Sequence, residues 1–322
     1  MRVLKATFDN IKKAAHIIKQ GGIVVFPTET VYGLGADAFN PQAVAKIFEV
    51  KERPRFDPLI VHINSLKWLD ILCSNVNDIV LNLARKFWPG PLTLVLPKKR
   101  GVPDIVTAGL STVAIRMPDS KVALSLIEEA GTPIAAPSAN KFGRLSSTCV
   151  EHVIKQFSSG IDIILDGGRC KIGVESTIVE VEENKIRVLR CGGLSLEEIA
   201  KVVNMSFVEI DTGIDEKLKS PGRLARHYAP STKLVIVKDF NFKPEAGRVG
   251  VLLFKLREIP FSTVHVEILS KNGNLVEAAA RLFESLHRLD EMGLDIIYAE
   301  AVPEVGLGRA IMERLYKASR EG

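Results

Sequence analysis

The sequence places three cations within five residues, at Lys51, Arg53 and Arg55. They close a segment with helical spacing, and Pro54 biases the residue before it away from the helix, so the cluster marks a helix end. Cations at such an end either complement the helix dipole in solvent or bind phosphate groups. The second interpretation predicts an anionic ligand beside this helix.

Two apolar segments each carry one polar side chain. His62 lies in LIVHI (59–63) and Arg116 in VAIRMP (113–118), and both segments have the pattern of buried strands. A lone histidine there is more often a hydrogen-bonded core residue than a catalytic one. A buried arginine needs an anionic partner or a cavity, whereas an arginine at a strand end can reach solvent. Arg116 is therefore a candidate anion contact, with solvent exposure as the alternative.

The segment 21–35, GGIVVFPTETVYGLG, changes abruptly from apolar to polar. We predict a buried strand over 23–26 and then a polar turn in which glycines let the backbone approach a ligand. The polar and glycine positions of this turn are Thr28, Glu29, Thr30, Tyr32, Gly33 and Gly35. PIAAPSAN (133–140) repeats this pattern of a buried strand followed by a proline and small polar residues. Ser138 and Asn140 therefore occupy positions that correspond to Thr28 and Thr30. Open α/β sheets bind ligands at such strand ends, although an ordinary strand and turn share the pattern.

Periodicity and capping residues predict an α/β protein of two domains. Predicted helices cover 11–18, 41–51, 77–88 and 274–289, with others capped by Ser120, by Ser147 or Thr148, and by Ser195, and one at the C-terminus. Predicted strands cover 23–26, 59–63, 93–97, 113–118, 162–168, 233–239, 248–254, 263–269 and 295–302, with a hairpin within 173–193. Because 206–232 lacks periodicity, we predict a catalytic domain over 1–205, a linker over 206–232 and a small α/β domain over 233–322.

Composition narrows the class of protein without choosing a function. The chain is 46% hydrophobic. It has no run of about 18 apolar residues and begins with MRVLKATFDN, which lacks a hydrophobic signal, so we expect a cytoplasmic enzyme that does not enter a membrane. The four cysteines form no C-x-x-C pair, and P-loop, G-x-G-x-x-G and H-E-x-x-H motifs are absent. The net charge of +5 is compatible with anionic partners such as nucleotides or RNA.

Eight ordered motifs resemble those of the long, two-domain form of the YrdC-like threonylcarbamoyl-AMP synthase family. They are PTETVYGLG (27–35), the pair Lys51 and Arg53, PLIVHI (58–63), WPGPLT (88–93), VAIRMP (113–118), APSAN (136–140), GVESTI (173–178) and SPG…RHYAP (220–230). The resemblance implies a YrdC-like twisted mixed sheet with flanking helices, and a small C-terminal α/β domain of Rossmann-like type. It also implies a nucleotidyltransferase that makes threonylcarbamoyl-AMP and pyrophosphate from L-threonine, bicarbonate or CO₂, and ATP.

The same resemblance assigns roles to individual residues. Its threonine-side positions are Thr30, His62, Arg116, Ala136 and Ser176. Its ATP-side positions are Lys51, Arg53, Asp57, Thr112, Ser138, Asn140, Ser146 and Arg190, with Lys51 and Arg53 as the catalytic pair on the phosphates. Because the reaction joins two anions, positioning and cations should supply most of the catalysis. Mg²⁺ is expected with ATP, held by phosphate and water rather than by dedicated protein ligands.

The implied product feeds the threonylcarbamoyladenosine modification of tRNA. The implied partners are therefore the downstream tRNA-threonylcarbamoyl transferase machinery and, as a further candidate, RNA itself. Two departures from the family pattern stand out: Asp57 replaces a frequent Asn, and the linker centre reads GRLA (222–225).

The linker segment SPGRLARHYAP (220–230) differs from a flexible spacer, which would be rich in Gly and Ser. Arg226, His227 and Tyr228 are suited to cover phosphates and adenine. We name these three residues the latch and predict that they close over the active site. The alternative is a surface tether with solvated charges.

Two other functions fit part of the pattern. A YrdC-like carbamoyl-transfer enzyme shares the nucleotide chemistry, but its acylphosphatase and zinc-finger segments are not visible in this sequence. A non-enzymatic RNA-binding protein would need interleaved aromatic residues and clustered basic ones. Aromatic residues make up only 6% of this chain and its charges are mixed.

Overall fold

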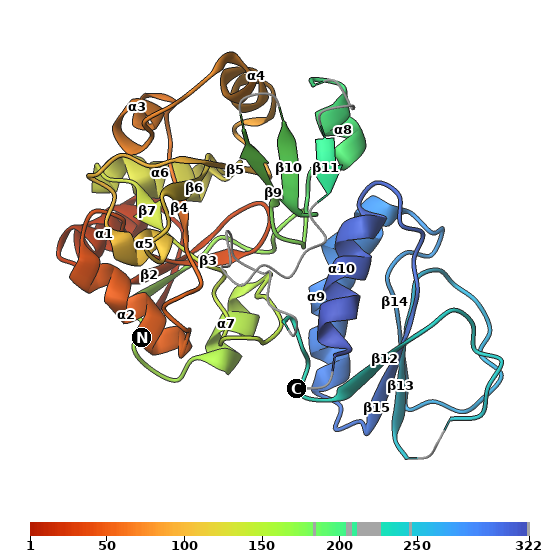
Figure 1. The fold of residues 1–322 in the computed structure, drawn as a ribbon. Helices are drawn as coiled ribbons and strands as arrows, with labels where there is room; N and C mark the ends of the chain where they lie inside the picture. The colour runs from red at the N-terminus through yellow and green to blue at the C-terminus, as the bar shows by residue number, and fades with distance from the viewer. Residues whose placement is uncertain (183–184, 204–207, 211–226, 245–246, 321–322) are drawn as a thin grey trace.

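The computed structural model describes residues 1–182, 185–203, 208–210, 227–244 and 247–320. It consists of two α/β domains, each built on its own sheet (Figure 1). In the described residues no helix is long and apolar enough to cross a membrane.

The N-terminal domain contains a mixed sheet of eleven strands in the order β1-β8-β2-β3-β7-β4-β6-β5-β9-β10-β11. The strands are β1 (Arg2–Lys5), β2 (Val24–Pro27), β3 (Tyr32–Asp37), β4 (Ile60–His62), β5 (Leu92–Pro97), β6 (Thr112–Arg116), β7 (Ile134–Ala135), β8 (Ile163–Asp166), β9 (Thr177–Val181), β10 (Ile186–Arg190) and β11 (Val208–Ile210). Parallel and antiparallel pairs alternate irregularly along it, so the predicted mixed sheet is confirmed.

Helices on this sheet begin mostly where the sequence offers a side-chain cap. Asn40, Asn77 and Ser120 each accept a hydrogen bond from a backbone amide two or three residues on, and the cap predicted at Ser120 is confirmed. The helices are α1 (Phe8–Lys19), α2 (Pro41–Lys51), α3 (Lys67–Leu72), α4 (Asp78–Phe87), α5 (Asp104–Thr107), α6 (Lys121–Ala130), α7 (Val150–Gln156) and α8 (Leu196–Ala200). The predicted cap of α7 is wrong: Cys149 precedes it, because Ser147 donates instead to the Ala139 carbonyl.

The predicted polar turn after the first buried strand is only partly correct. Residues from Tyr32 onward form β3, which pairs antiparallel with β2, so only 28–31 turn. Gly35 therefore serves packing rather than a ligand, because a Cβ there would lie 2.5 Å from Ile134 Cγ2 and 2.6 Å from Phe26 Cε1. The Tyr32 hydroxyl donates a hydrogen bond to the Gly168 carbonyl at 2.7 Å, so its proton is already used within the protein.

The C-terminal domain is a parallel four-stranded sheet in the order β12-β15-β13-β14. Its elements are β12 (Lys233–Val237), β13 (Val249–Leu253), β14 (His265–Ile268), α9 (Leu275–Asp290), β15 (Ile296–Glu300) and α10 (Gly308–Ala318). In Figure 1, α9 and α10 lie between this sheet and the N-terminal domain. The predicted small α/β domain is confirmed, and its helices form the contact surface between the two domains.

The two domains pack closely. One apolar cluster joins Val31, Leu145 and Val174 of the N-terminal domain to residues of α9 and α10. Gly173 has φ +77°, and a Cβ there would lie 2.5 Å from the Ala280 Cα of α9, so only glycine allows this approach. The predicted linker range 206–232 includes β11, which pairs with β10. The N-terminal sheet therefore extends to Ile210 instead of ending by residue 205.

Candidate active site

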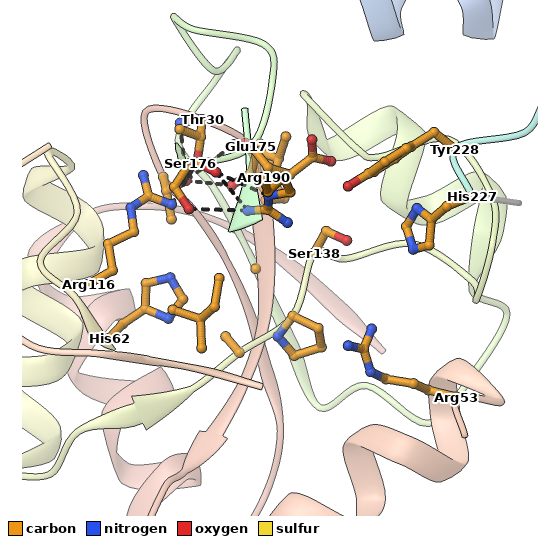
Figure 2. Close-up of a pocket in the computed structure, with 17 residues that line it drawn as sticks. Thr30, Arg53, His62, Arg116, Ser138, Glu175, Ser176, Arg190, His227 and Tyr228 are labelled. Carbon is orange, nitrogen blue, oxygen red and sulfur yellow. Dashed lines mark hydrogen bonds between the residues drawn. The ribbon is translucent and has the colours of Figure 1, made fainter. Parts of the chain in front are cut away.

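A polar pocket opens between the N-terminal sheet, the loops after β2 and β7, the segment before β9, and residues 227–228 (Figure 2). Its empty space, counting the open mouth, is about 520 Å³. Three arginines line it, Arg53, Arg116 and Arg190, against one carboxylate, Glu175. Their positive charge suits a ligand with several negative groups.

Arg116 lies at one end of the pocket beside His62 and Thr30 (Figure 2). Its guanidinium Nη1 donates to Thr30 Oγ1 at 2.9 Å, and Nη2 forms an ion pair with Glu29 Oε1 at 2.5 Å. The anionic partner that a buried arginine requires is thus supplied by the chain itself. The burial of Arg116 alone no longer argues for a bound carboxylate, and solvent exposure is excluded, since its side chain is 4% exposed.

His62 is buried beside Arg116, and its Nδ1 has no hydrogen-bond partner in the described structure. Burial, and next the charge of Arg116, lower its pKa to about 3, so the ring is neutral near pH 7. The structure places His62 in the pocket lining with one ring nitrogen unpaired, and not only in the core. A neutral imidazole with a free nitrogen can form a hydrogen bond to a ligand.

Ser176 and Arg190 form the upper wall in Figure 2. Arg190 Nη2 donates to the Ser176 carbonyl at 2.9 Å and to Ser176 Oγ at 3.2 Å. Ser176 Oγ also lies 2.7 Å from Thr93 Oγ1 of β5. β9 pairs with both β5 and β10, and this pairing brings the three side chains together although they are far apart in sequence.

Arg53 lies across the pocket from Arg116, with Ser138 between them (Figure 2). Its Nη2 is 2.8 Å from Asp57 Oδ1 and 2.9 Å from the Pro58 carbonyl. Asp57 is fully buried behind Arg53 and does not line the pocket, and neither carboxylate oxygen has a hydrogen bond of good geometry. Asp57 thus contacts the predicted phosphate cation, and a direct contact with ATP stays a prediction.

Lys51 does not line the pocket either, although it was predicted beside Arg53 on the phosphates. Its ammonium donates to the carbonyls of Ser138 and Asn140 in the buried loop after β7. Burial and the neighbouring Arg53 lower its pKa well below the usual value. Asn140 is also turned away, because its amide donates to the carbonyls of Lys141 and Arg144. Both residues shape the loop that carries Ser138.

Two further ATP-side predictions, Ser146 and Thr112, are not part of the pocket lining. Ser146 is buried and donates its hydroxyl to Glu175 Oε1, so it contacts a lining residue from behind. Thr112 begins β6 and lines a second hollow together with Asn75, Asn77 and Glu180. Of the predicted site residues, the lining contains Thr30, His62, Arg116, Ala136, Ser176, Arg53, Ser138, Arg190, His227 and Tyr228.

The described part of the latch closes the remaining side of the pocket (Figure 2). Ala229 N donates to the Gly143 carbonyl at 2.8 Å, and His227 N donates to the Lys317 carbonyl at 3.3 Å, so both domains hold the segment. His227 Nδ1 and the Tyr228 hydroxyl are buried without a hydrogen-bond partner in the described structure. Arg226 lies outside the described residues. Two unpaired polar groups facing a pocket fit the predicted latch better than a solvated tether.

Sequence reasoning missed Glu175 as a site residue. It stands next to Ser176 in GVESTI, and a carboxylate beside a predicted substrate contact was the available signal. Glu175 is 5% exposed and lines the pocket, and its second oxygen accepts a hydrogen bond from the C-terminal domain.

Comparisons with known proteins agree along the whole chain. The family model described as "Telomere recombination" matches residues 16–192, and the model described as "Threonylcarbamoyl-AMP synthase, C-terminal domain" matches residues 194–320. A threonylcarbamoyl-AMP synthase of Pyrococcus abyssi is 45% identical, with 96% of this chain and 94% of the relative covered. That of Bacillus subtilis is 42% identical, covering 96% and 92%.

A crystal structure of P. abyssi Sua5 in complex with L-threonine has a TM-score of 0.93 to this structure. It is 42% identical, and the match covers 99% of this chain and 98% of that one. The predicted fold and enzyme class are confirmed, and neither the carbamoyl-transfer nor the RNA-binding alternative is supported by these relatives. The chain therefore belongs to the threonylcarbamoyl-AMP synthase family and is an enzyme of that kind.

Proposed function

We propose that this pocket joins L-threonine, bicarbonate or CO₂, and ATP into threonylcarbamoyl-AMP, with the amino acid at the Arg116 end and the phosphates toward Arg53 and Arg190. The observation that carries the proposal is the separation of two cationic ends by Ser138 within one pocket (Figure 2). A reaction that joins two anionic partners is favoured when each partner has its own cationic site beside a shared centre.

The Arg116 end offers groups that match an amino acid with a hydroxyl side chain. Thr30 Oγ1, Ser176 Oγ and His62 Nδ1 supply polar contacts, while Ala136 supplies an apolar wall for a methyl group. Arg116 can place part of its guanidinium on the substrate carboxylate while it remains paired with Glu29.

The chemistry requires positioning more than a protein nucleophile. The threonine amine attacks the carbon of CO₂ and loses a proton, and a carbamate oxygen then attacks the α-phosphorus of ATP while pyrophosphate leaves. Both partners in the second step are anionic, so the guanidinium groups of Arg53 and Arg190 would offset their repulsion. The neutral His62 adds no charge at the amino-acid end.

We propose that Mg²⁺ enters with ATP and neutralises phosphate charge. In the described residues there is no cluster of three or more His, Cys, Asp or Glu side chains that could hold a metal ion. Glu29 and Asp57 are paired with Arg116 and Arg53. Phosphate oxygens and water are therefore the ligands that we propose for the ion.

We further propose that the product passes to the tRNA-threonylcarbamoyl transferase machinery in the cytoplasm. An acyl adenylate hydrolyses readily, so a pocket covered by the latch would protect it until release. Direct RNA contact remains a secondary proposal, supported by the net charge of +5.

The test is to incubate the pure protein with ATP, Mg²⁺, bicarbonate and L-threonine and to measure pyrophosphate. We expect release that depends on both threonine and bicarbonate, with threonylcarbamoyl-AMP identified by mass spectrometry. A parallel reaction replaces bicarbonate with carbamoyl phosphate, which is the donor that a carbamoyl-transfer enzyme would use. Equal pyrophosphate release without threonine, or release only with carbamoyl phosphate, would contradict the proposal.

A further inference from the structure

The C-terminal domain reaches the pocket through two buried side chains. Arg314 of α10 is fully buried, and its Nε donates to Glu175 Oε2 at 3.0 Å. His287 of α9 has its Nε2 3.1 Å from the Ser146 carbonyl. Ser146 donates its hydroxyl to the other oxygen of Glu175. Both helices therefore contact the same Ser146–Glu175 pair, and Glu175 lines the pocket.

Arg314 also fixes the backbone next to a second lining residue. Its Nη1 donates to the carbonyl of Cys191, which follows Arg190 in sequence. The neighbouring Glu313 accepts a hydrogen bond from the Cys191 amide at 2.9 Å. One turn of α10 thus holds both polar groups of the Cys191 backbone and the carboxylate of Glu175.

The third contact of Arg314 is with the latch. Its guanidinium carbon lies 5.3 Å from the centroid of the Tyr228 ring, a distance at which a cation is attracted to an aromatic face. Tyr228 also packs against Phe283 of α9, with ring centroids 5.7 Å apart. Arg314 therefore contacts three separate parts of the pocket wall: Glu175, the segment after Arg190, and Tyr228.

We propose that Arg314 is a positioning residue for the N-terminal active site, and that it sets the orientation of Glu175 and Arg190 on the phosphate side. A planar guanidinium can satisfy a carboxylate and a carbonyl at once, which a lysine cannot do in the same geometry. Without it, Glu175 would be a buried charge with no cation on its inner side. Its carboxylate would then turn toward Arg190 and withdraw that cation from a bound phosphate.

This inference rests on the proposed placement of the ATP phosphates near Arg53 and Arg190. It gives the C-terminal domain a defined part in catalysis, although that domain supplies no lining residue to the described pocket.

The experiment measures the KM values for ATP and L-threonine by pyrophosphate release in the full-length protein. For Arg314→Met we expect the KM for ATP to rise about tenfold, the scale of one lost hydrogen bond to a charged group. The KM for threonine should change by less than about threefold, because Arg116, Thr30 and His62 do not contact α10. Equal changes in both KM values would indicate general disruption and overturn the inference.

Arg309→Met is the matched control. Arg309 lies on the same helix and also joins the two domains, through Glu197 of α8 at 2.5 Å, but it does not touch the pocket lining. We expect both KM values to stay within about threefold, since partly exposed ion pairs contribute little. If Arg309→Met raised the KM for ATP as much as Arg314→Met, interdomain adhesion would explain the effect and the positioning role would be wrong.

A double-mutant cycle with Glu175→Gln tests the route of the effect. If Arg314 acts through Glu175, the Met substitution should raise the KM for ATP much less in the Gln background than in the native one. Additive effects would contradict this route. If Arg314→Met does not fold, the double variant is used instead, because it removes both buried charges. The single Glu175→Gln variant then tests the Arg314–Glu175 contact from the carboxylate side.

Arg190→Met separates this inference from the proposed function, because Arg190 lines the pocket. A raised KM for ATP in Arg190→Met with an unchanged one in Arg314→Met would refute only the positioning role. An unchanged KM for ATP in Arg190→Met would refute the proposed placement of ATP.

Discussion

The ammonium of Lys51 donates a hydrogen bond to the carbonyl oxygen of Ser138 at 2.6 Å, which ties the end of α2 to the loop after β7. The same ammonium also donates to the Asn140 carbonyl. Ser138 lines the pocket while Lys51 does not, so the lysine influences the site through the backbone of this loop.

Replacing Lys51 should therefore affect both stability and catalysis. Lys51→Met leaves buried carbonyls unpaired, and we expect a loss of about 2–4 kcal/mol in the free energy of unfolding. Turnover should fall about tenfold or more as Ser138 moves. Urea denaturation and pyrophosphate release measure the two effects. Slower turnover at unchanged stability would instead support the direct phosphate contact predicted from the sequence.

Arg116 should govern the amino-acid requirement. Arg116→Ala strands the buried Glu29, so the informative variant is Arg116→Met with Glu29→Gln, which removes both charges. We expect the KM for threonine to rise about tenfold or more, the scale of a lost charge-assisted contact, with little change for ATP. The single Glu29→Gln variant is the control. Comparable losses for both substrates would rule out this assignment.

The Tyr228 hydroxyl tests the latch with a single-atom change. It has no hydrogen-bond partner in the described structure, and burial raises its pKa to about 12, so it stays protonated. Tyr228→Phe should leave the free energy of unfolding unchanged or raise it by up to about 1 kcal/mol. We expect a several-fold higher KM for ATP. If Tyr228→Phe and Tyr228→Ala both bound ATP normally, the segment would be only a tether.

Acid should weaken the interface between the domains. His152 of α7 stacks on His287 of α9 with ring centroids 3.8 Å apart. Burial, and next the charge of His287, lower the pKa of His152 to about 3, and burial also lowers that of His287. In the unfolded chain these histidines bind protons near pH 6.5, whereas in the folded protein they stay neutral at that pH. The folded state is therefore fully stable with respect to these groups above pH 6.5, and it loses stability as the pH falls toward 3. The charged groups that face the pair are Lys155, Arg169, Arg288, Asp290 and Glu291.

We expect His152 to account for about 2 kcal/mol of the stability lost between pH 6.5 and pH 5. Chemical denaturation at both pH values, in the native protein and in His152→Asn, measures it, because asparagine keeps an acceptor near Thr148. Buried His62 and His227 also contribute to the pH dependence of the free energy of unfolding, and their contribution remains in the variant. An identical pH dependence in the two proteins would show that His152 does not titrate with unfolding.

Sequence patterns predicted the features that depend on near neighbours. Ser120 and Ser195 cap their helices through amides three residues away, so spacing alone identifies them. The apolar runs that became β4, β5 and β6 are likewise continuous in sequence. The pocket residues Thr30, Arg53 and Arg116 were predicted both from local patterns and from the family motifs in which they lie.

What the sequence by itself determined is thus the set of local elements, the family and most of the pocket lining. Only the tertiary structure decided which groups pair: Arg116 with Glu29, 87 positions apart, and Arg314 with Glu175, 139 positions apart. It also showed that YGLG (32–35) is part of a strand, and that Lys51 and Asn140 form hydrogen bonds behind the pocket lining. Caps and apolar runs are stabilised within a few residues, whereas a buried charge takes whichever partner the packing of distant elements brings within reach.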